Sequence, residues 1–339
     1  MKNRLRRTIV LAACLGWAGS LSAEPAAVSE PALLRKMPRR VLEKLASGGR
    51  PDAEGLVGHN RGRWLHVGAQ RGAMLYLSAA AALSEREHAE RAWAAVDAAF
   101  ARQTPAGNFE LGNFQGRTPR RSDDLSGVSF WLAELCHALV VLRQSELRPQ
   151  FEDRLNALRP KIERAAWWLV DGRAELERYD AGAPNRLFFD ANAFRFLGIL
   201  LEDQRLSAIG TEFLARGLRA QRADGVFVEK GGHDSSYQAV ALLKLLQHRL
   251  HFPDERLDAA IERGMRWELA RIGPDGQVSV AGNTRTGAGQ EKFLGRPKDV
   301  NYAEVLLGTL YFAALHDDQP AREAAERLVA YVSKRPAER

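Results

Sequence analysis

The stretch DGVFVEKGGHDSSYQAVALLKLL, residues 224–246, contains the features that decide the fold. An Asp-Gly turn and a short extended segment lead to two glycines and then to a polar cluster that runs from His233 to Tyr237. The helix that follows is apolar on nearly every side, and such a helix is buried in a folded protein. Polar residues at the start of a buried helix either cap it or form a binding site, and both interpretations are open at this point.

The same order of features recurs 51 residues further along the chain. Asp275 and a glycine form the turn, an extended segment follows, and the polar cluster GNTR at residues 282–285 precedes another apolar helix. Short strands are expected at residues 226–229 and 277–280, directly after the two turns. A repeat of this kind indicates stacked helical hairpins whose equivalent turns meet at one end of the structure.

Helical periodicity dominates the remaining sequence. Helices that are apolar all round alternate with amphipathic helices, such as residues 255–272, which have one solvated face. Consecutive helices with short links predict an all-α architecture, in which an inner ring of buried helices lies inside an outer ring. Helices are expected over residues 36–47, 70–84, 86–103, 126–144, 149–171, 187–202, 205–221, 235–251, 255–272, 300–316 and 320–334.

Three features together resemble the (α/α) toroid of many carbohydrate-active enzymes, among them polysaccharide lyases and several glycoside hydrolases. They are the repeated helical hairpins, the Asp-Gly-x-Phe turn before an inner helix, and the His-x-x-x-Tyr spacing at its start. The resemblance covers residues 36–335 in architecture, although its sharp motifs cover only 224–237 and 282–285. It implies one toroid domain over residues 36–339. The Asn-Asn-His-x-Tyr-Trp type of motif found in alginate lyases of this fold is absent, which argues against alginate as the substrate.

The first 23 residues have the pattern of a secretory signal peptide. A basic segment, MKNRLRR, precedes the apolar segment TIVLAACLGWAGSLSA, and small residues at its end suit cleavage. We therefore expect export to a periplasm or to the medium, with residues 24–35 as a flexible leader. Elsewhere no run reaches the ~20 apolar residues that a membrane span needs, so no span is expected.

Charge and cysteine content exclude several classes of function. The formal net charge is +7, and removal of a signal peptide with four basic residues would leave about +3, too little to indicate nucleic-acid binding. It would also leave Cys136 as the only cysteine, in an apolar helical pattern that predicts a buried, unreactive thiol. With no His-x-x-x-His or Cys cluster, neither a metal nor another cofactor is expected.

His233 and Tyr237 form the first candidate catalytic pair. Four residues apart, they would share one face of a helix, so that one takes a proton and the other returns one to a leaving oxygen. The alternative is that Asp234 or Ser235 caps the helix, while Tyr237 packs and His233 only forms a hydrogen bond.

The repeated loop supplies a second candidate group. Asn283 and Arg285 could hold and neutralise a carboxylate, the guanidinium by two parallel hydrogen bonds, although an ordinary polar turn has the same composition. Neutralising a uronate carboxylate is what β-elimination requires. The sequence therefore favours a polysaccharide lyase acting on an acidic polysaccharide, with His233 as base and Tyr237 as acid, or the reverse.

Further polar residues are candidates for substrate binding. Asp190 and Asn192 interrupt a strongly apolar segment, where they must be hydrogen-bonded, capping or functional. Two other functions stay open: a glycoside hydrolase with Glu229, Asp190 or Asp234 as acid and base, and a non-catalytic carbohydrate-binding protein of an exopolysaccharide system. The substrate-binding candidates are Asn185, Arg186, Asp190, Asn192, Glu229, Asp234, Lys292, Arg296 and Lys298.

Overall fold

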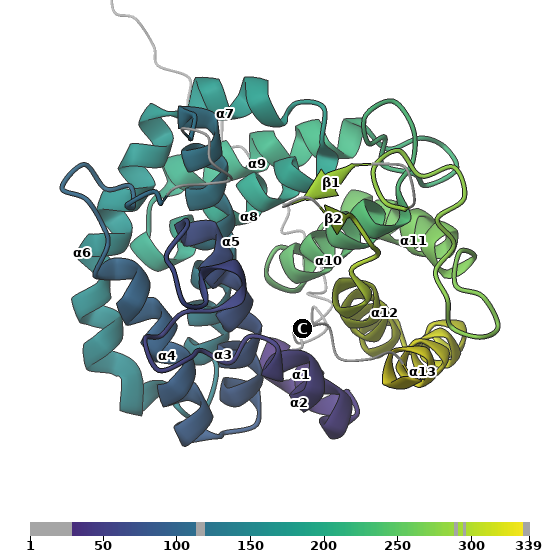
Figure 1. Cartoon of the computed structure of the whole chain (residues 1–339), viewed down its shortest axis with the longest axis horizontal. Coiled ribbons are helices and arrows are strands. Elements are labelled where there is room, and N and C mark those ends of the chain that lie inside the picture. Colours follow the sequence, from purple (N-terminus) through teal and green to yellow (C-terminus); the bar gives the residue numbers. More distant parts are fainter. Residues whose placement is uncertain (1–28, 113–118, 288–290, 294–295, 335–339) are drawn as a thin grey trace, which may run out of the picture.

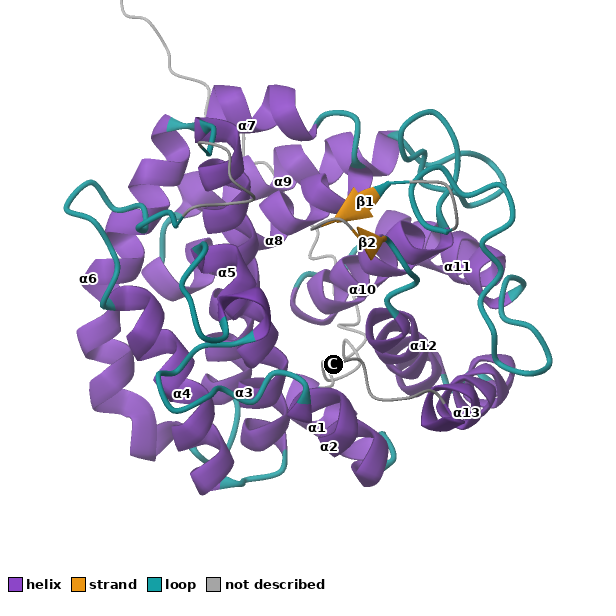
Figure 2. Ribbon diagram, in the orientation of Figure 1, coloured by secondary structure: helices purple, strands orange, loops and turns teal. Residues whose placement is uncertain are grey.

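The computed structural model describes residues 29–112, 119–287, 291–293 and 296–334, and these residues are mostly helical (Figures 1 and 2). The signal peptide expected at residues 1–23 lies outside this part of the chain. The helices are α1 (Glu30–Lys36), α2 (Arg39–Ser47), α3 (Gly72–Ala82), α4 (Arg86–Phe100), α5 (Arg121–Arg143), α6 (Arg148–Asp171), α7 (Arg173–Asp180), α8 (Pro184–Leu201), α9 (Gln204–Arg219), α10 (Ser235–His251), α11 (Glu255–Leu269), α12 (Tyr302–His316) and α13 (Gln319–Lys334), with short 3-10 turns η1 (Gly58–Asn60) and η2 (Val67–Arg71).

Six helices form a closed inner ring. α1, α3, α5, α8, α10 and α12 each contact the next, and α12 contacts α1 again. α2, α4, α6, α9, α11 and α13 pack against the outside of this ring (Figure 1). The prediction of an (α/α) toroid, all-α with an inner and an outer ring, is therefore confirmed.

The sequence explains which helices lie inside. The inner helix α8 buries residues on every side, Phe188, Phe189 and Phe194 among them. The outer helix α11 buries one stripe that includes Leu257 and Ile261, four residues apart on one face. Among the described residues, α5 is the one helix long and apolar enough to cross a membrane, and most of its apolar stretch is buried inside the ring.

The predicted repeat appears as three equivalent turns. Gly107, Gly225 and Gly276 all have positive φ, at 107°, 91° and 85°. A Cβ at these positions would lie 2.4, 2.3 and 2.1 Å from a carbonyl oxygen of α6, α11 and α13, respectively. Only glycine fits so close to a backbone in this conformation, so each turn packs against the next outer helix.

Three expectations about elements need correction. Residues 30–35, expected in a flexible leader, form helix α1 and bury Leu33 and Leu34 in the core. α7 was not predicted. The segments 226–229 and 277–280 make isolated bridges instead of strands, since each pairs back to the end of its own outer helix with no further strand beside it. The described strands are β1 (Lys292–Phe293) and β2 (Arg296–Pro297), an antiparallel pair.

Candidate active site

The two ends of the ring differ in chemistry, and we call them the rim and the floor. At the rim α3, α5, α8, α10 and α12 begin; at the floor these helices end. The backbone N–H of Asn301, just before α12, donates to the Ser236 hydroxyl at the start of α10, which places both starts side by side. The polar clusters that the sequence singled out therefore lie at the rim, as the repeat predicted.

Asp234 joins two segments of the rim. Its carboxylate caps α10 by accepting the N–H groups of Ser236 and Tyr237 at 3.1 and 3.2 Å. It also accepts the N–H of Arg285 at 2.9 Å, and from Thr286 both the N–H at 2.7 Å and the hydroxyl at 2.9 Å. Because five donors occupy it, Asp234 is a capping and clamping residue, which corrects its assignment to substrate binding.

The Asn283 side chain also forms hydrogen bonds within the protein, at the start of α10. The repeat correctly placed its loop beside the His233 cluster, since His233 and Asn283 form a parallel bridge. However, the Asn283 oxygen accepts the N–H of Ser235 at 3.1 Å, and its amide donates to the Ser235 hydroxyl at 3.0 Å. The side chain is buried and its hydrogen bonds are used, so the predicted role in neutralising a substrate carboxylate does not fit.

His233 and Tyr237 point to different partners. α10 begins only at Ser235, so His233 lies before the helix and the spacing of four does not bring the two side chains onto one face. The His233 Nε2 lies 3.1 Å from the Ala281 carbonyl oxygen, and its ring packs on Trp267 of the outer helix α11. The expected proton-transfer pair is therefore wrong in its geometry.

Tyr237 belongs instead to a compact ionic cluster. Its hydroxyl accepts a hydrogen bond from Lys298 at 2.8 Å, and the Arg285 guanidinium lies 3.9 Å from its ring centroid. Arg285 donates to Glu229 at 2.6 Å and twice to Glu291 at 3.1 Å. With 5% of its surface exposed, Arg285 is already neutralised by two carboxylates, so its predicted role toward a substrate uronate does not fit.

The two carboxylates of this cluster differ in environment. Burial raises the pKa of Glu229, although Arg285 opposes the shift. Burial also acts to raise the pKa of Glu291, but hydrogen bonds from Lys230 and Lys298 and the charge of Arg285 lower it to about 2. Glu291 is therefore firmly ionised and holds three cationic side chains together.

The remaining predicted binding residues divide into core and surface. The Asn192 amide donates to the Lys244 carbonyl at 2.9 Å and its oxygen lies 2.8 Å from the His248 Nδ1, so it ties α8 to α10 in the core. Asn185 is buried, and its side-chain oxygen has no partner within the described residues. Lys292 is exposed on β1. Arg296 begins β2, but its side chain lies outside the described part of the structure.

Asp190 lies near a second buried carboxyl, that of Asp180, to which Arg186 is bound. Asp180, at the end of α7, accepts a hydrogen bond from Arg186 at 2.9 Å, and Asp190 accepts one from Ser129 at 2.5 Å. Burial raises the pKa of both carboxyls, that of Asp190 well above its usual value, and the nearby charge of Asp180 raises it further. The Oδ2 atom of Asp190 is buried and has no hydrogen-bond partner within the described residues. Relative to an exposed aspartate, Asp190 therefore favours its protonated form.

Aromatic rings and cations meet in the interior of the ring. Phe130 of α5 and Phe189 of α8 pack with ring centroids 4.4 Å apart. The Arg71 guanidinium lies 5.7 and 5.9 Å from these two centroids, and the Lys244 ammonium lies 4.9 Å from that of Phe189. Arg186 approaches the Phe130 ring from the rim at 5.9 Å. Three basic side chains thus surround this aromatic pair inside the ring.

Two partly exposed carboxyls face this group. Glu134 of α5 forms an ion pair with Lys244. Glu304, in the first turn of α12, is half-buried, and burial raises its pKa against the opposing charges of Arg71 and Lys244. The charge of Glu134 raises this pKa further, whereas the hydrogen bond that Asn301 donates at 2.6 Å lowers it. The net result is a carboxyl group with a raised pKa near a second carboxyl that is paired with Lys244.

The sequence contains a signal for this interior group that our sequence analysis missed. Glu134 and Lys244 each interrupt a long apolar stretch in the middle of an inner helix, and Glu304 is the one acidic or basic residue of α12 apart from the terminal His316. A charge in a helix that must be buried is costly unless it is paired or functional.

A surface pocket of about 600 Å³ lies elsewhere, outside the ring between α2 and α3, and shares no residue with these groups.

Comparison with known proteins identifies the fold. No family model matches the sequence, and a search of curated proteins gives no match. Among solved structures, the fold is similar to the crystal structure of a mutant of an unsaturated glucuronyl hydrolase from Streptococcus agalactiae. The TM-score is 0.54 at 9% sequence identity, and the alignment covers 92% of this chain and 85% of that chain. At this identity the likeness establishes the (α/α) toroid, and residue roles rest on the site itself.

Proposed function

We propose that this protein is a glycoside hydrolase that binds an acidic saccharide inside the ring. The observation that carries this proposal is the pair Glu304 and Glu134, one carboxyl with a raised pKa beside one that is paired with Lys244. Glycoside hydrolysis needs such a pair, with one carboxyl as proton donor and the other as carboxylate. The structural neighbour, a glucuronyl hydrolase on the same fold, supports hydrolysis over elimination.

In this proposal Glu304 donates its proton to the leaving oxygen of the glycosidic bond. Glu134 acts on the opposite side of the sugar, as base toward a water molecule or as nucleophile, and the separation of the two carboxyls decides which. Phe130, which is partly exposed and packs on the buried Phe189, offers an apolar face against which a sugar ring can pack. Arg71, which lies beside these rings, would attract an acidic sugar, whereas Arg186 is paired with Asp180.

The lyase alternative is weaker because its neutralising group is occupied. Arg285 and Asn283 are bound to protein partners, as described above. Elimination would still need an acid or a base, and Tyr237, next to Lys298 and Arg285, is the residue that could serve as one.

We also retain export to the periplasm or the medium as part of the proposal, since the N-terminal pattern supports it.

The experiment that tests the proposal is a screen of purified protein against uronate-containing oligosaccharides. Hydrolysis should release new reducing ends without the ultraviolet absorbance of an unsaturated product. Glu304→Gln should abolish this release, because glutamine cannot donate the proton, whereas Glu255→Gln, in the first turn of the outer helix α11, should leave it unchanged. Binding without cleavage by the wild type, or full activity of Glu304→Gln, would contradict the proposal.

A further inference from the structure

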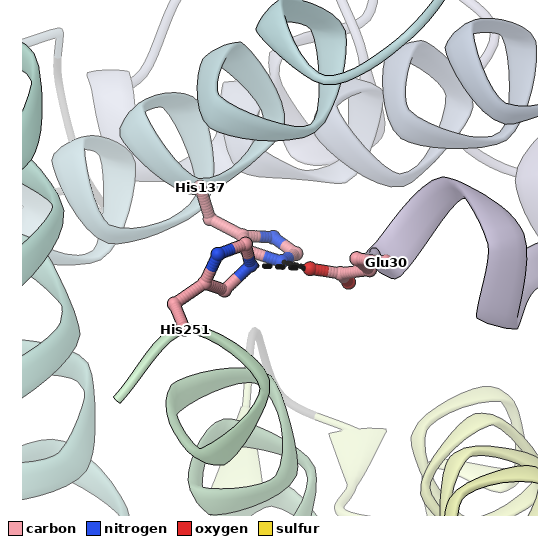
Figure 3. A group of neighbouring side chains, drawn as sticks. All are labelled: Glu30, His137 and His251. Carbon is pink, nitrogen blue, oxygen red and sulfur yellow. Dashed lines mark hydrogen bonds and ion pairs between the residues drawn. The ribbon is translucent and has the colours of Figure 1, made fainter. Parts of the chain in front are cut away.

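The floor of the ring contains a buried cluster that plays no part in the proposed reaction. Glu30 of α1, His137 of α5 and His251 at the end of α10 point toward one another (Figure 3). Each histidine Nε2 lies 2.7 Å from the same Glu30 oxygen, Oε2. Glu30 is 1% exposed, and the side chains of both histidines are buried as well.

The chemistry of these three groups is that of a transition-metal site. Two imidazole nitrogens and one carboxylate oxygen are a ligand set found at Zn²⁺, with a water molecule or another group in the fourth tetrahedral position. Their ligand atoms all lie within 4.8 Å of one another. With bonds of about 2.1 Å, tetrahedral geometry places ligand atoms roughly 3.4 Å apart, so the present 2.7 Å contacts need to open by less than 1 Å. Small side-chain rotations are sufficient for that.

The cluster lies among apolar groups. The ring of Phe196 packs on His137 and on His251, each with centroids 5.2 Å apart. Polar atoms enclosed among apolar side chains need partners, and a divalent cation would be a partner for all three ligand atoms at once.

A neighbouring residue has the position of a supporting partner. The Tyr311 hydroxyl of α12 donates to Oε1 of Glu30, the oxygen that the histidines do not contact. Hydrogen bonds to ligands commonly fix their orientation in metal sites. Tyr311 would thus leave Oε2 directed at the cation.

We propose that Glu30, His137 and His251 bind one divalent transition-metal ion of the Zn²⁺ type, which fastens α1 to α5 and α10. The role is structural, since the cluster lies at the floor and α1 closes the inner ring. The proposal is independent of the hydrolase activity and runs against the sequence-based expectation of no metal. The ligands come from residues 30, 137 and 251, so no short spacing motif could have indicated them.

Metal binding to the purified full chain tests this proposal directly. After treatment with a chelator, titration with Zn²⁺ should show one tight site per chain. At a hundredfold excess over Kd, the ion should raise the Tm by about 5 °C or more. Both effects should disappear in His251→Gln and persist in His88→Gln, whose side chain is 40% exposed on α4 and paired with Glu85. Equal zinc binding by His251→Gln and the wild type would overturn the proposal, as would a wild type without a tight site.

A second measurement covers the case in which His251→Gln does not fold. Zinc-edge X-ray absorption of the wild-type protein loaded with one equivalent of Zn²⁺ should show two imidazole ligands and one carboxylate. A spectrum with only water and carboxylate ligands would overturn the assignment.

Discussion

Replacing Asp234 by alanine should destabilise the protein by about 4 kcal/mol. Loss of the cap on α10 accounts for about 1 kcal/mol. The variant also leaves three donors of residues 285 and 286 without their acceptor in a buried setting, which adds about 3 kcal/mol at the lower end of the usual cost. For a protein of this size the Tm should fall by roughly 10 °C.

The matched control is Asp254→Ala. Asp254 caps the outer helix α11 through one backbone N–H, that of Arg256, and clamps no second segment. Its removal should cost about 1 kcal/mol, or roughly 3 °C in Tm. Thermal unfolding followed by circular dichroism measures both variants. Equal losses in the two variants would refute the reasoning that Asp234 holds the repeated loops together.

Three further predictions concern buried charges. As pH rises above about 4, the stability of Asp190→Asn should increase relative to that of the wild type. The pKa of Asp190 is raised in the folded wild-type protein, so that the folded state binds more protons than the unfolded state. The wild type therefore loses stability as pH rises toward the pKa of folded Asp190, and the variant does not. Measurement of Tm as a function of pH for both proteins tests this prediction, and the same pH dependence in the two would refute it. Arg285→Met should cost about 3–5 kcal/mol by leaving Glu229 buried without its partner; a Tm near that of the wild type would argue against it. The pH profile of kcat/KM should fall on its alkaline side at a pKa above the ordinary 4.5 of Glu304, and a profile without that limb would exclude Glu304 as the acid.

The fold could be predicted from the sequence because burial and turn geometry leave local signals. Helices apolar on every side, such as α8, belong inside, and amphipathic helices such as α11 belong outside. The Asp-Gly turns required glycine at positions where no Cβ fits, which made the repeat visible. α1 was missed because its apolar residues, Leu33 and Leu34 among them, are buried by helices that come later in the chain, such as α3 and α12.

The arrangement of the two repeated loops was predicted, but neither their contacts nor the interior carboxyls Glu134 and Glu304 were. The repeat correctly placed residues 283–285 beside His233, because equivalent turns of a toroid lie together. It could not show that Arg285 is held by Glu229 and Glu291, since those partners depend on how the loops fold back. The His233 and Tyr237 pairing failed for a local reason, because the helix begins two residues after His233.

The most direct test of the central claim is cleavage of a uronate-containing oligosaccharide in water labelled with heavy oxygen. Hydrolysis incorporates one solvent oxygen into the product, whereas β-elimination incorporates none and creates a carbon–carbon double bond. The account predicts a labelled, saturated product from the wild type and no product from Glu304→Gln. An unlabelled, unsaturated product would contradict it.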